Sequence, residues 1–289
     1  MITVNSISGG KTSSYIAANY PADFNVFSLV RTKDKSCMFP DKKIRQIVSD
    51  KIQKPFIGTL EDDNIITILL DLEQFIGTEI SWVSGNTFDD VINGEWNKGR
   101  NGSNYLPNLM VRYCTTHLKM NPIFEWWKNE INEVVDMRIG FRANETKRAS
   151  KMISKLNSNG VDEMKTIVGS RGSRNKWGMV EWRVPIFPLI NDLIYKDSIE
   201  NYWNKNKEVK FKNGYYNNCV GCFHRNPIFL NKMFQEHPNK MEWFAKQEEK
   251  NKPNQFKSEI SYRKIIENKK QIEIQWDDFN ECDSGYCGL

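Results

Sequence analysis

The feature that most constrains the fold is the regular alternation of strand-like and helix-like segments from the first residues onward. Residues 2–7 alternate apolar and polar side chains, as a short buried strand does, and the pattern ends at Gly9 and Gly10. A hydroxyl-rich helix start follows at residues 12–14, and Pro21 ends that helix. A strand, a glycine turn and a helix start therefore come in immediate succession.

The same alternation continues through most of the chain. Further strand-like runs occupy residues 23–31, 55–60, 79–83, 132–141, 165–170 and 182–186, and helical patterns occupy residues 41–54, 62–75, 87–92 and 196–205. This order predicts an α/β fold with a Rossmann-like parallel sheet and helices on both faces. We expect this nucleotide-binding domain to span residues 1–206. Residues 207–289 should form a smaller helical C-terminal region that contains cysteines.

The glycine turn has the composition of a phosphate-binding loop. Its seven residues combine two glycines, one cation and four hydroxyl groups: Ser8, Gly9, Gly10, Lys11, Thr12, Ser13 and Ser14. Glycines let the backbone approach an anion, and the first amides and the dipole of the following helix favour negative charge there. The spacing fits neither a Walker A loop nor a dinucleotide fingerprint. An ordinary capped helix after a turn is the alternative interpretation.

Two later segments also carry groups that bind anions. Arg112, Thr115 and Lys119 surround a predicted helix start, where cations and hydroxyls suit a phosphate or sulfate group. Gly140 ends the predicted strand 132–141, and Arg142 and Glu145 follow it. Capped or solvated helix faces would explain both patterns without a ligand. Because ligands of open α/β sheets bind at the carboxyl ends of strands, we expect the three segments to meet in one crevice.

The cysteines indicate a metal site. Cys219 and Cys222 form a Cys-x-x-Cys turn, and Cys282 and Cys287 form a second pair near the end of the sequence. Four thiolates in two pairs suit either structural zinc or a [4Fe-4S] cluster. Inert buried thiols are the alternative. No basic leader or membrane-length apolar run occurs, so we expect a cytoplasmic protein without a membrane partner, in which thiols stay reduced.

The motifs together resemble a known family. The stretch Ser8 to Ser13 resembles the PP-loop of the adenine-nucleotide alpha-hydrolase superfamily, and Thr12, where most members carry Asp, is similar to the phosphoadenosine-phosphosulfate (PAPS) reductase-like branch. Residues 106–122 and 140–145 resemble that family's next two signatures, although Phe141 and Asn144 stand where Ile and Asp are more usual. The resemblance covers roughly residues 1–205 and, more weakly, the tail. It implies an adenine-nucleotide-binding enzyme in which Arg112 and Lys119 face the anionic end of the nucleotide.

The resemblance leaves the reaction open. Tyr286-Cys287-Gly288-Leu289 is similar to the tail of sulfonucleotide reductases, which implies an oxidoreductase with Cys287 as nucleophile, Lys119 and Arg142 as catalytic cations, and a thiol reductant protein as partner. A cluster would then draw on Cys114, Cys219, Cys222 and Cys282. The alternative is an ATP pyrophosphatase that adenylates an acceptor, with Mg²⁺ bound to ATP, and transfers sulfur. The substrate is accordingly ATP, adenosine phosphosulfate or PAPS.

A non-catalytic role is the remaining class of function. The net charge of +5 suits a polyanionic ligand without by itself predicting nucleic acid. The aromatic- and lysine-rich C-terminal part would suit base stacking in a nucleotide-sensing or nucleic-acid-associated module, or would simply form the core of a helical appendage. Oligomeric state, including a homo-oligomer, stays open.

Overall fold

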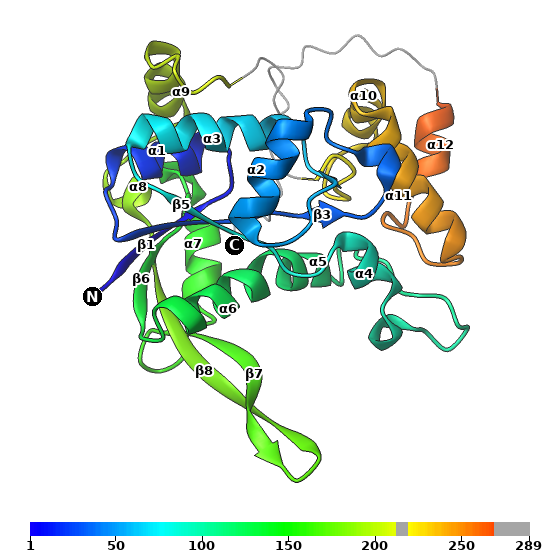
Figure 1. The fold of residues 1–289 in the computed structure, drawn as a ribbon, viewed down its shortest axis with the longest axis horizontal. Helices are drawn as coiled ribbons and strands as arrows, with labels where there is room; N and C mark the ends of the chain where they lie inside the picture. The colour runs from blue at the N-terminus through cyan, green and yellow to red at the C-terminus, as the bar shows by residue number, and fades with distance from the viewer. Residues whose placement is uncertain (212–218, 269–289) are drawn as a thin grey trace.

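A mostly parallel six-stranded sheet forms the centre of the computed structural model, which describes residues 1–211 and 219–268 (Figure 1). The strand order is β5-β2-β1-β6-β8-β7, and all neighbouring strands are parallel except β7 and β8. The strands are β1 (Thr3–Ile7), β2 (Phe24–Ser28), β5 (Ile80–Val83), β6 (Val135–Arg138), β7 (Asp162–Arg171) and β8 (Arg174–Ile186). The predicted α/β class with a parallel sheet is confirmed.

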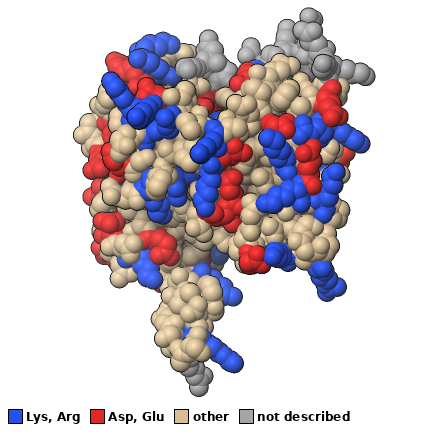
Figure 2. All heavy atoms as spheres, turned by 45° about the vertical axis from the view of Figure 1, so that its right-hand side comes forward, with Lys and Arg blue, Asp and Glu red and all other residues tan. Residues whose placement is uncertain are grey.

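The antiparallel pair β7 and β8 differs from the sequence prediction. We expected short strands at residues 165–170 and 182–186, but β8 runs without interruption from Arg174 to Ile186 and pairs with β7 along the length of that strand. Only Arg183–Ile186 also pairs with β6. The rest of β8 and the part of β7 that pairs with it form a two-stranded arm that projects away from the body (Figures 1 and 2).

Helices cover both faces of the sheet, as predicted. The helices beside it are α1 (Lys11–Asn19), α2 (Lys42–Ile52), α3 (Asn64–Ile76), α6 (Asn121–Glu130), α7 (Thr146–Ile153), α8 (Pro188–Asn191) and α9 (Lys196–Lys205). Ile7 and Phe27 pack in one core with residues of α1, α2, α3 and α9. Val4 and Val26, whose side chains point the opposite way, pack in another core with residues of α6 and α7. Central strands buried on both faces explain the apolar runs seen in the sequence.

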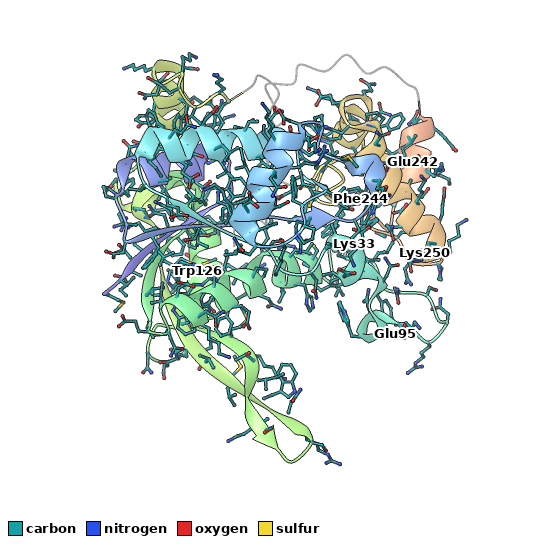
Figure 3. All side chains as sticks on the ribbon, viewed as in Figure 1. Lys33, Glu95, Trp126, Glu242, Phe244 and Lys250 are labelled. Atoms are coloured by element: carbon teal, nitrogen blue, oxygen red, sulfur yellow. The ribbon has the colours of Figure 1, made fainter. Side chains whose placement is uncertain are left out.

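The C-terminal helices share a third core with earlier parts of the chain. They are α10 (Pro227–Glu236), α11 (Pro238–Lys250) and α12 (Tyr262–Glu267). Phe244 of α11 lies where they meet the rest of the molecule: its ring centroid is 6.0 Å from that of Phe88 and 5.8 Å from that of Tyr262 (Figure 3). Phe88 begins α4 (Phe88–Asn93), which Thr87 caps as predicted. The described part of this region contains these three helices, and their core includes residues from 30 to 118 as well.

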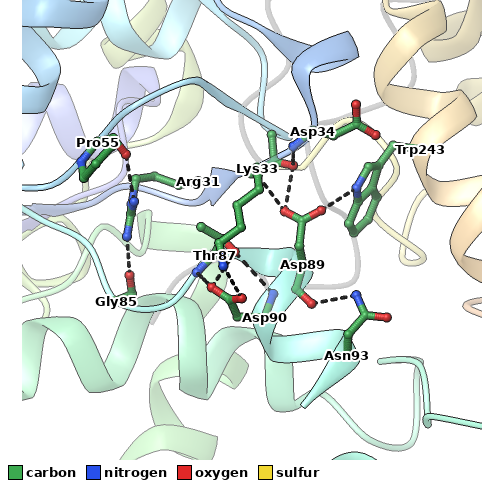
Figure 4. A network of polar contacts seen from close by, with 11 residues as sticks. Arg31, Lys33, Asp34, Pro55, Gly85, Thr87, Asp89, Asp90, Asn93 and Trp243 are labelled. Carbon is green, nitrogen blue, oxygen red and sulfur yellow. Dashed lines mark hydrogen bonds and ion pairs between the residues drawn. The ribbon is translucent and has the colours of Figure 1, made fainter.

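A polar network fastens these helices to the strand-end loops (Figure 4). One oxygen of the Asp89 carboxylate accepts hydrogen bonds from Thr32 Oγ1 and the Lys33 amide, both at 2.8 Å, and the other accepts one from Trp243 Nε1 at 2.9 Å. Thr32 belongs to β3 (Arg31–Thr32), which pairs with β4 (Gly58–Thr59). Asp89 therefore joins α4, a strand-end loop and α11.

Within the described residues, no helix is both long and apolar enough to cross a membrane.

Candidate functional site

The glycine loop lies at the point where the strand order reverses. From β1, the chain pairs with β2 on one side and with β6 on the other, and all three strands are parallel. Open α/β sheets bind ligands beyond the carboxyl ends of strands at such a switch point. The residues that follow β1 are Ser8, Gly9 and Gly10, and Gly140 follows β6. Two of the three predicted anion-binding segments thus meet at this edge.

Gly140 makes the contact between these two segments. A Cβ atom at Gly140 would lie 3.6 Å from the backbone nitrogen and Cα of Ser13, and 3.6 Å from Cγ2 of Thr12. The backbone after β6 therefore runs directly past the first turn of α1. The first amides of a helix have no partners within the helix, so an anion placed between these segments would meet donors that the helix itself does not use.

Backbone conformation explains why the loop contains Gly9. Its φ is +75°, in the left-handed region that side chains disfavour, and a Cβ there would lie 2.4 Å from Cγ1 of Ile65. Gly10 is extended and caps α1. The turn and the close approach of α3 thus both depend on Gly9.

The hydroxyl groups of the loop divide between two roles. Ser13 Oγ accepts a hydrogen bond from the Ser8 amide at 3.1 Å, lies 3.0 Å from Ser8 Oγ, and donates to the Gly10 carbonyl at 3.1 Å. Ser13 therefore holds the loop in shape. Ser14 Oγ is fully buried and has no hydrogen-bond partner among the described residues. A buried hydroxyl without a partner is unusual in a folded protein.

Lys11 is directed toward α9. Its ammonium forms an ion pair with Glu200, and its carbonyl accepts a hydrogen bond from Trp203 Nε1 at 2.9 Å. The predicted role of Lys11 in phosphate binding stays a prediction, because the described arrangement gives its charge another partner.

The loop after β6 is fixed by Glu145. Its carboxylate accepts hydrogen bonds from the Arg142 amide at 2.8 Å and from Arg142 Nε at 3.1 Å, and it also pairs with Arg148. Burial raises the pKa of Glu145, but the Arg142 hydrogen bond and the two guanidinium charges outweigh it, so the pKa lies below its usual value. The Arg148 guanidinium also lies 4.2 Å from the centre of the Phe141 ring. Glu145 thus acts here by positioning the two arginines.

The third segment, residues 112–119, lies beside a group of thiols. Arg112 precedes a short helical turn, α5 (Tyr113–Thr115), which continues as the π-helical turn Thr116–Met120. Ser28 Oγ, at the end of β2, donates a hydrogen bond to the Leu118 carbonyl at 2.9 Å. The segment therefore reaches the same edge of the sheet as the glycine loop. π-Helical turns inside helices occur frequently at functional sites.

Lys119 forms an ion pair with a buried carboxylate. Its ammonium lies 2.9 Å from Oε1 of Glu61, and Glu61 is fully buried. Burial lowers the pKa of Lys119, but Glu61 and the neighbouring Cys219 more than offset this, so the pKa is raised. Oε2 of Glu61 has no hydrogen-bond partner within residues 1–211 and 219–268. A buried carboxylate oxygen without a hydrogen-bond partner is costly.

Three thiols gather around this pair. Cys219 forms an antiparallel bridge with Glu61, and the Val220 amide donates to the Leu60 carbonyl at 2.8 Å. Burial raises the pKa of Cys219 well above its usual value, and the nearby Glu61 carboxylate raises it further. Burial raises the pKa of Cys114 to about 11, with a further contribution from the neighbouring Cys222. Cys114, Cys219 and Cys222 are therefore electrostatic neighbours.

The Cys-x-x-Cys turn depends on the glycine at its third position. The Cys222 amide donates to the Cys219 carbonyl at 3.1 Å, which closes the turn. A Cβ at Gly221 would lie 2.3 to 2.6 Å from three carbons of the Phe244 ring. Gly221 thus allows α11 to pack directly on the turn that presents both thiols.

The predicted four-thiolate metal site stays a prediction. Within residues 1–211 and 219–268, no three His, Cys, Asp or Glu side chains are arranged to hold a single metal ion. Cys282 and Cys287 lie outside the described residues. Cys37 is buried, its Sγ lies 3.7 Å from the Asn239 carbonyl, and burial raises its pKa to about 11.

Sequence reasoning missed Glu61, and it gave Cys114 only a secondary place. Glu61 follows a predicted strand, which is a common position for functional polar residues, so a signal was present. The glycine loop and the thiols are connected through this segment: Ile65 contacts the Gly9 turn, and Glu61 contacts Lys119 and Cys219.

The chain is thus an α/β protein with a glycine loop at the switch point of its sheet and a cluster of three cysteine thiols at the same edge of the sheet. Comparisons with protein-family models, with curated proteins and with solved structures find no match to this chain.

Proposed function

We propose that the chain is an adenine-nucleotide-binding enzyme of the PAPS reductase-like type, and that it reduces a sulfonucleotide with release of sulfite. The observation that carries the proposal is the close approach of Gly140 to Thr12 and Ser13, which brings two segments that resemble family signatures side by side. Neighbouring thiols at the same sheet edge support chemistry at sulfur.

The thiol arrangement supports one of the two cysteine assignments. The Cys222 thiol contributes to the raised pKa of Cys114, which places Cys114 near the Cys-x-x-Cys turn. As described, the three side chains are not arranged around a single ion, so their role as ligands together with one tail cysteine rests on the resemblance. We assign Cys282 as this fourth ligand, which leaves Cys287 as the nucleophile. A [4Fe-4S] cluster suits four thiolates from several segments, and it would supply electrostatic stabilisation beside the bound sulfonucleotide.

The reaction proceeds by two thiol exchanges. The Cys287 thiolate attacks the sulfonate sulfur, the bond between sulfur and the bridging phosphate oxygen breaks, and the nucleotide leaves with that electron pair. A dithiol reductant then attacks Cys287 Sγ and releases sulfite, and its second thiol closes a disulfide that frees Cys287. The dithiol supplies both electrons. Arg142 and the first amides of α1 would bind the departing phosphate.

Two assays test the proposal. Anaerobically purified protein is given adenosine phosphosulfate, PAPS or ATP with a dithiol, and products are read by mass spectrometry. Sulfite with AMP or adenosine 3′,5′-bisphosphate is expected, and Cys287→Ser should abolish it while Cys37→Ala, a thiol outside this group, retains it. AMP and pyrophosphate from ATP, with no sulfite, would instead identify adenylation and sulfur transfer.

Metal content tests the ligand assignment separately. We expect iron and sulfide, and we expect Cys114→Ala to lower both while Cys287→Ala leaves them unchanged. The reverse result would assign Cys219, Cys222, Cys282 and Cys287 as the four ligands, and zinc without sulfide would exclude a cluster.

A further inference from the structure

The projecting arm is a two-stranded ribbon with both faces open. β7 and β8 pair from Asp162 opposite Arg183 to Arg171 opposite Arg174, and only the four residues from Arg183 to Ile186 also pair with β6. Gly172, with φ of +58°, lies in the turn at the tip. At about 3.3 Å per residue, the ribbon reaches roughly 30 Å beyond the last residue that pairs with β6.

The outer part of this arm carries charge of a single sign. From Met164 to Val180 the sequence contains four basic residues and no acidic residue: Lys165, Arg171, Arg174 and Lys176. Lys165, Arg174 and Lys176 are exposed. Three acidic residues lie at the root of the arm, Asp162, Glu163 and Glu181. Asp162 pairs with Arg183 at 2.7 Å, and Glu181 accepts hydrogen bonds from Asn157 and Asn159. In Figure 2 the protruding end of the arm is tan and blue.

The arm also exposes large apolar side chains. Trp177 is 58% exposed and Met179 is 55% exposed, and Ile167 and Val168 are exposed as well. Trp177 lies opposite Ile167 and Met179 lies opposite Lys165, so these four side chains share one face of the ribbon. Gly178 lies beneath Val168 on the other face. A ribbon that keeps a tryptophan and a methionine in water gains little from packing, which indicates a partner.

We propose that this arm binds nucleic acid. Its basic side chains would contact phosphates, and the Trp177 ring would stack on or insert between bases. A two-stranded ribbon has the width that the major groove of duplex DNA admits. An acidic protein surface would satisfy the charges but would leave the flat exposed ring without a matching stacking partner. This surface is separate from the nucleotide crevice, and the inference does not depend on the proposed reaction.

The test is fluorescence anisotropy with duplex DNA, single-stranded DNA and single-stranded RNA, without adenine nucleotide. We expect binding that weakens roughly 50-fold between 50 and 200 mM salt, as about three phosphate contacts would give. The triple variant Lys165→Gln/Arg174→Gln/Lys176→Gln should lose at least tenfold in affinity. The matched control Lys42→Gln/Lys43→Gln/Lys246→Gln removes the same charge from exposed body positions and should change affinity less than twofold.

Trp177→Ala separates base recognition from general anion binding. We expect it to weaken nucleic acid binding roughly tenfold, as loss of one stacking contact does, and to leave binding to heparin unchanged. Preference for single strands would assign stacking as the mode, and preference for duplex would assign groove binding. Absence of binding at 50 mM salt, or equal weakening in both triple variants, would overturn the proposal. So would self-association that Trp177→Ala abolishes while nucleic acid binding stays unchanged.

Discussion

The glycine loop and the cluster of thiols (Cys114, Cys219 and Cys222) lie at the same edge of the sheet, but they are assembled differently. The loop is one continuous stretch, Ser8 to Ser14, beside which Gly140 lies. The thiol group draws on three segments that lie far apart in the sequence, around Glu61, around Cys114 to Lys119, and around Cys219 to Cys222. The first site depends on local backbone conformation, and the second depends on the C-terminal helices packing against the rest.

This difference predicts different responses to substitution. Substitutions in the glycine loop should lower stability through backbone strain and through clashes with the adjoining α3. Damage at the thiols should act through the shared core around Phe244 and through buried charges.

Gly9→Ala should lower the free energy of unfolding by about 3 kcal/mol, because it combines left-handed strain with overpacking against Ile65. Gly160→Ala is the matched control, since Gly160 has the same φ of +75° but a Cβ atom there would meet nothing within 4 Å. It should cost only about 1 kcal/mol. Urea denaturation of both variants measures the difference, and equal costs would contradict the tight contact between the loop and α3.

Gly221→Ala should cost about 2–3 kcal/mol, because its Cβ would overlap the Phe244 ring. The loss should be accompanied by reduced iron content, since the Cys-x-x-Cys turn would move. Thermal unfolding and metal analysis check this. Loss of iron with unchanged adenine-nucleotide affinity would sharpen the contrast, and a variant with wild-type stability would contradict the packing of α11 on this turn.

Glu248 should make stability of the C-terminal region depend on pH. Its carboxylate accepts hydrogen bonds from the Phe256 and Tyr262 amides, and burial raises its pKa from 4.5 to about 7. The folded state binds the Glu248 proton more tightly than the unfolded state does. The protonated carboxyl therefore contributes to the free energy of unfolding below pH 4.5, and this contribution is lost as pH rises to about 7. Relative to Glu248→Gln, the wild type should lose on the order of 2 kcal/mol over this range. Urea denaturation at several pH values measures it, and parallel curves for the two proteins would refute the assignment.

Local sequence patterns were sufficient to predict the local features. The glycine turn after the first strand, the Thr87 cap and the double covering of the sheet followed from residue spacing. The partner of Lys11 did not, because Glu200 lies 189 residues away in the chain. Cys114 and Glu61 join the thiol group only through packing of the C-terminal helices, which no periodicity encodes. The sequence prediction made the strands of the arm too short, because polar residues 174–176 show no alternation of apolar and polar side chains.

Nucleotide binding beside Gly140 can be measured with two substitutions of different size. A Cβ there makes only ordinary contact with Thr12 and Ser13, so Gly140→Ala should fold and bind normally, whereas the larger Gly140→Leu side chain should occupy the position beside the first turn of α1 where we propose that the phosphate binds. Isothermal titration with ATP, adenosine phosphosulfate and PAPS compares both variants with the wild type. We expect the wild type and Gly140→Ala to bind one of these nucleotides equally, and Gly140→Leu to lose at least tenfold in affinity with an unchanged melting temperature. Equal affinity in all three proteins, or no binding to the wild type, would contradict the account.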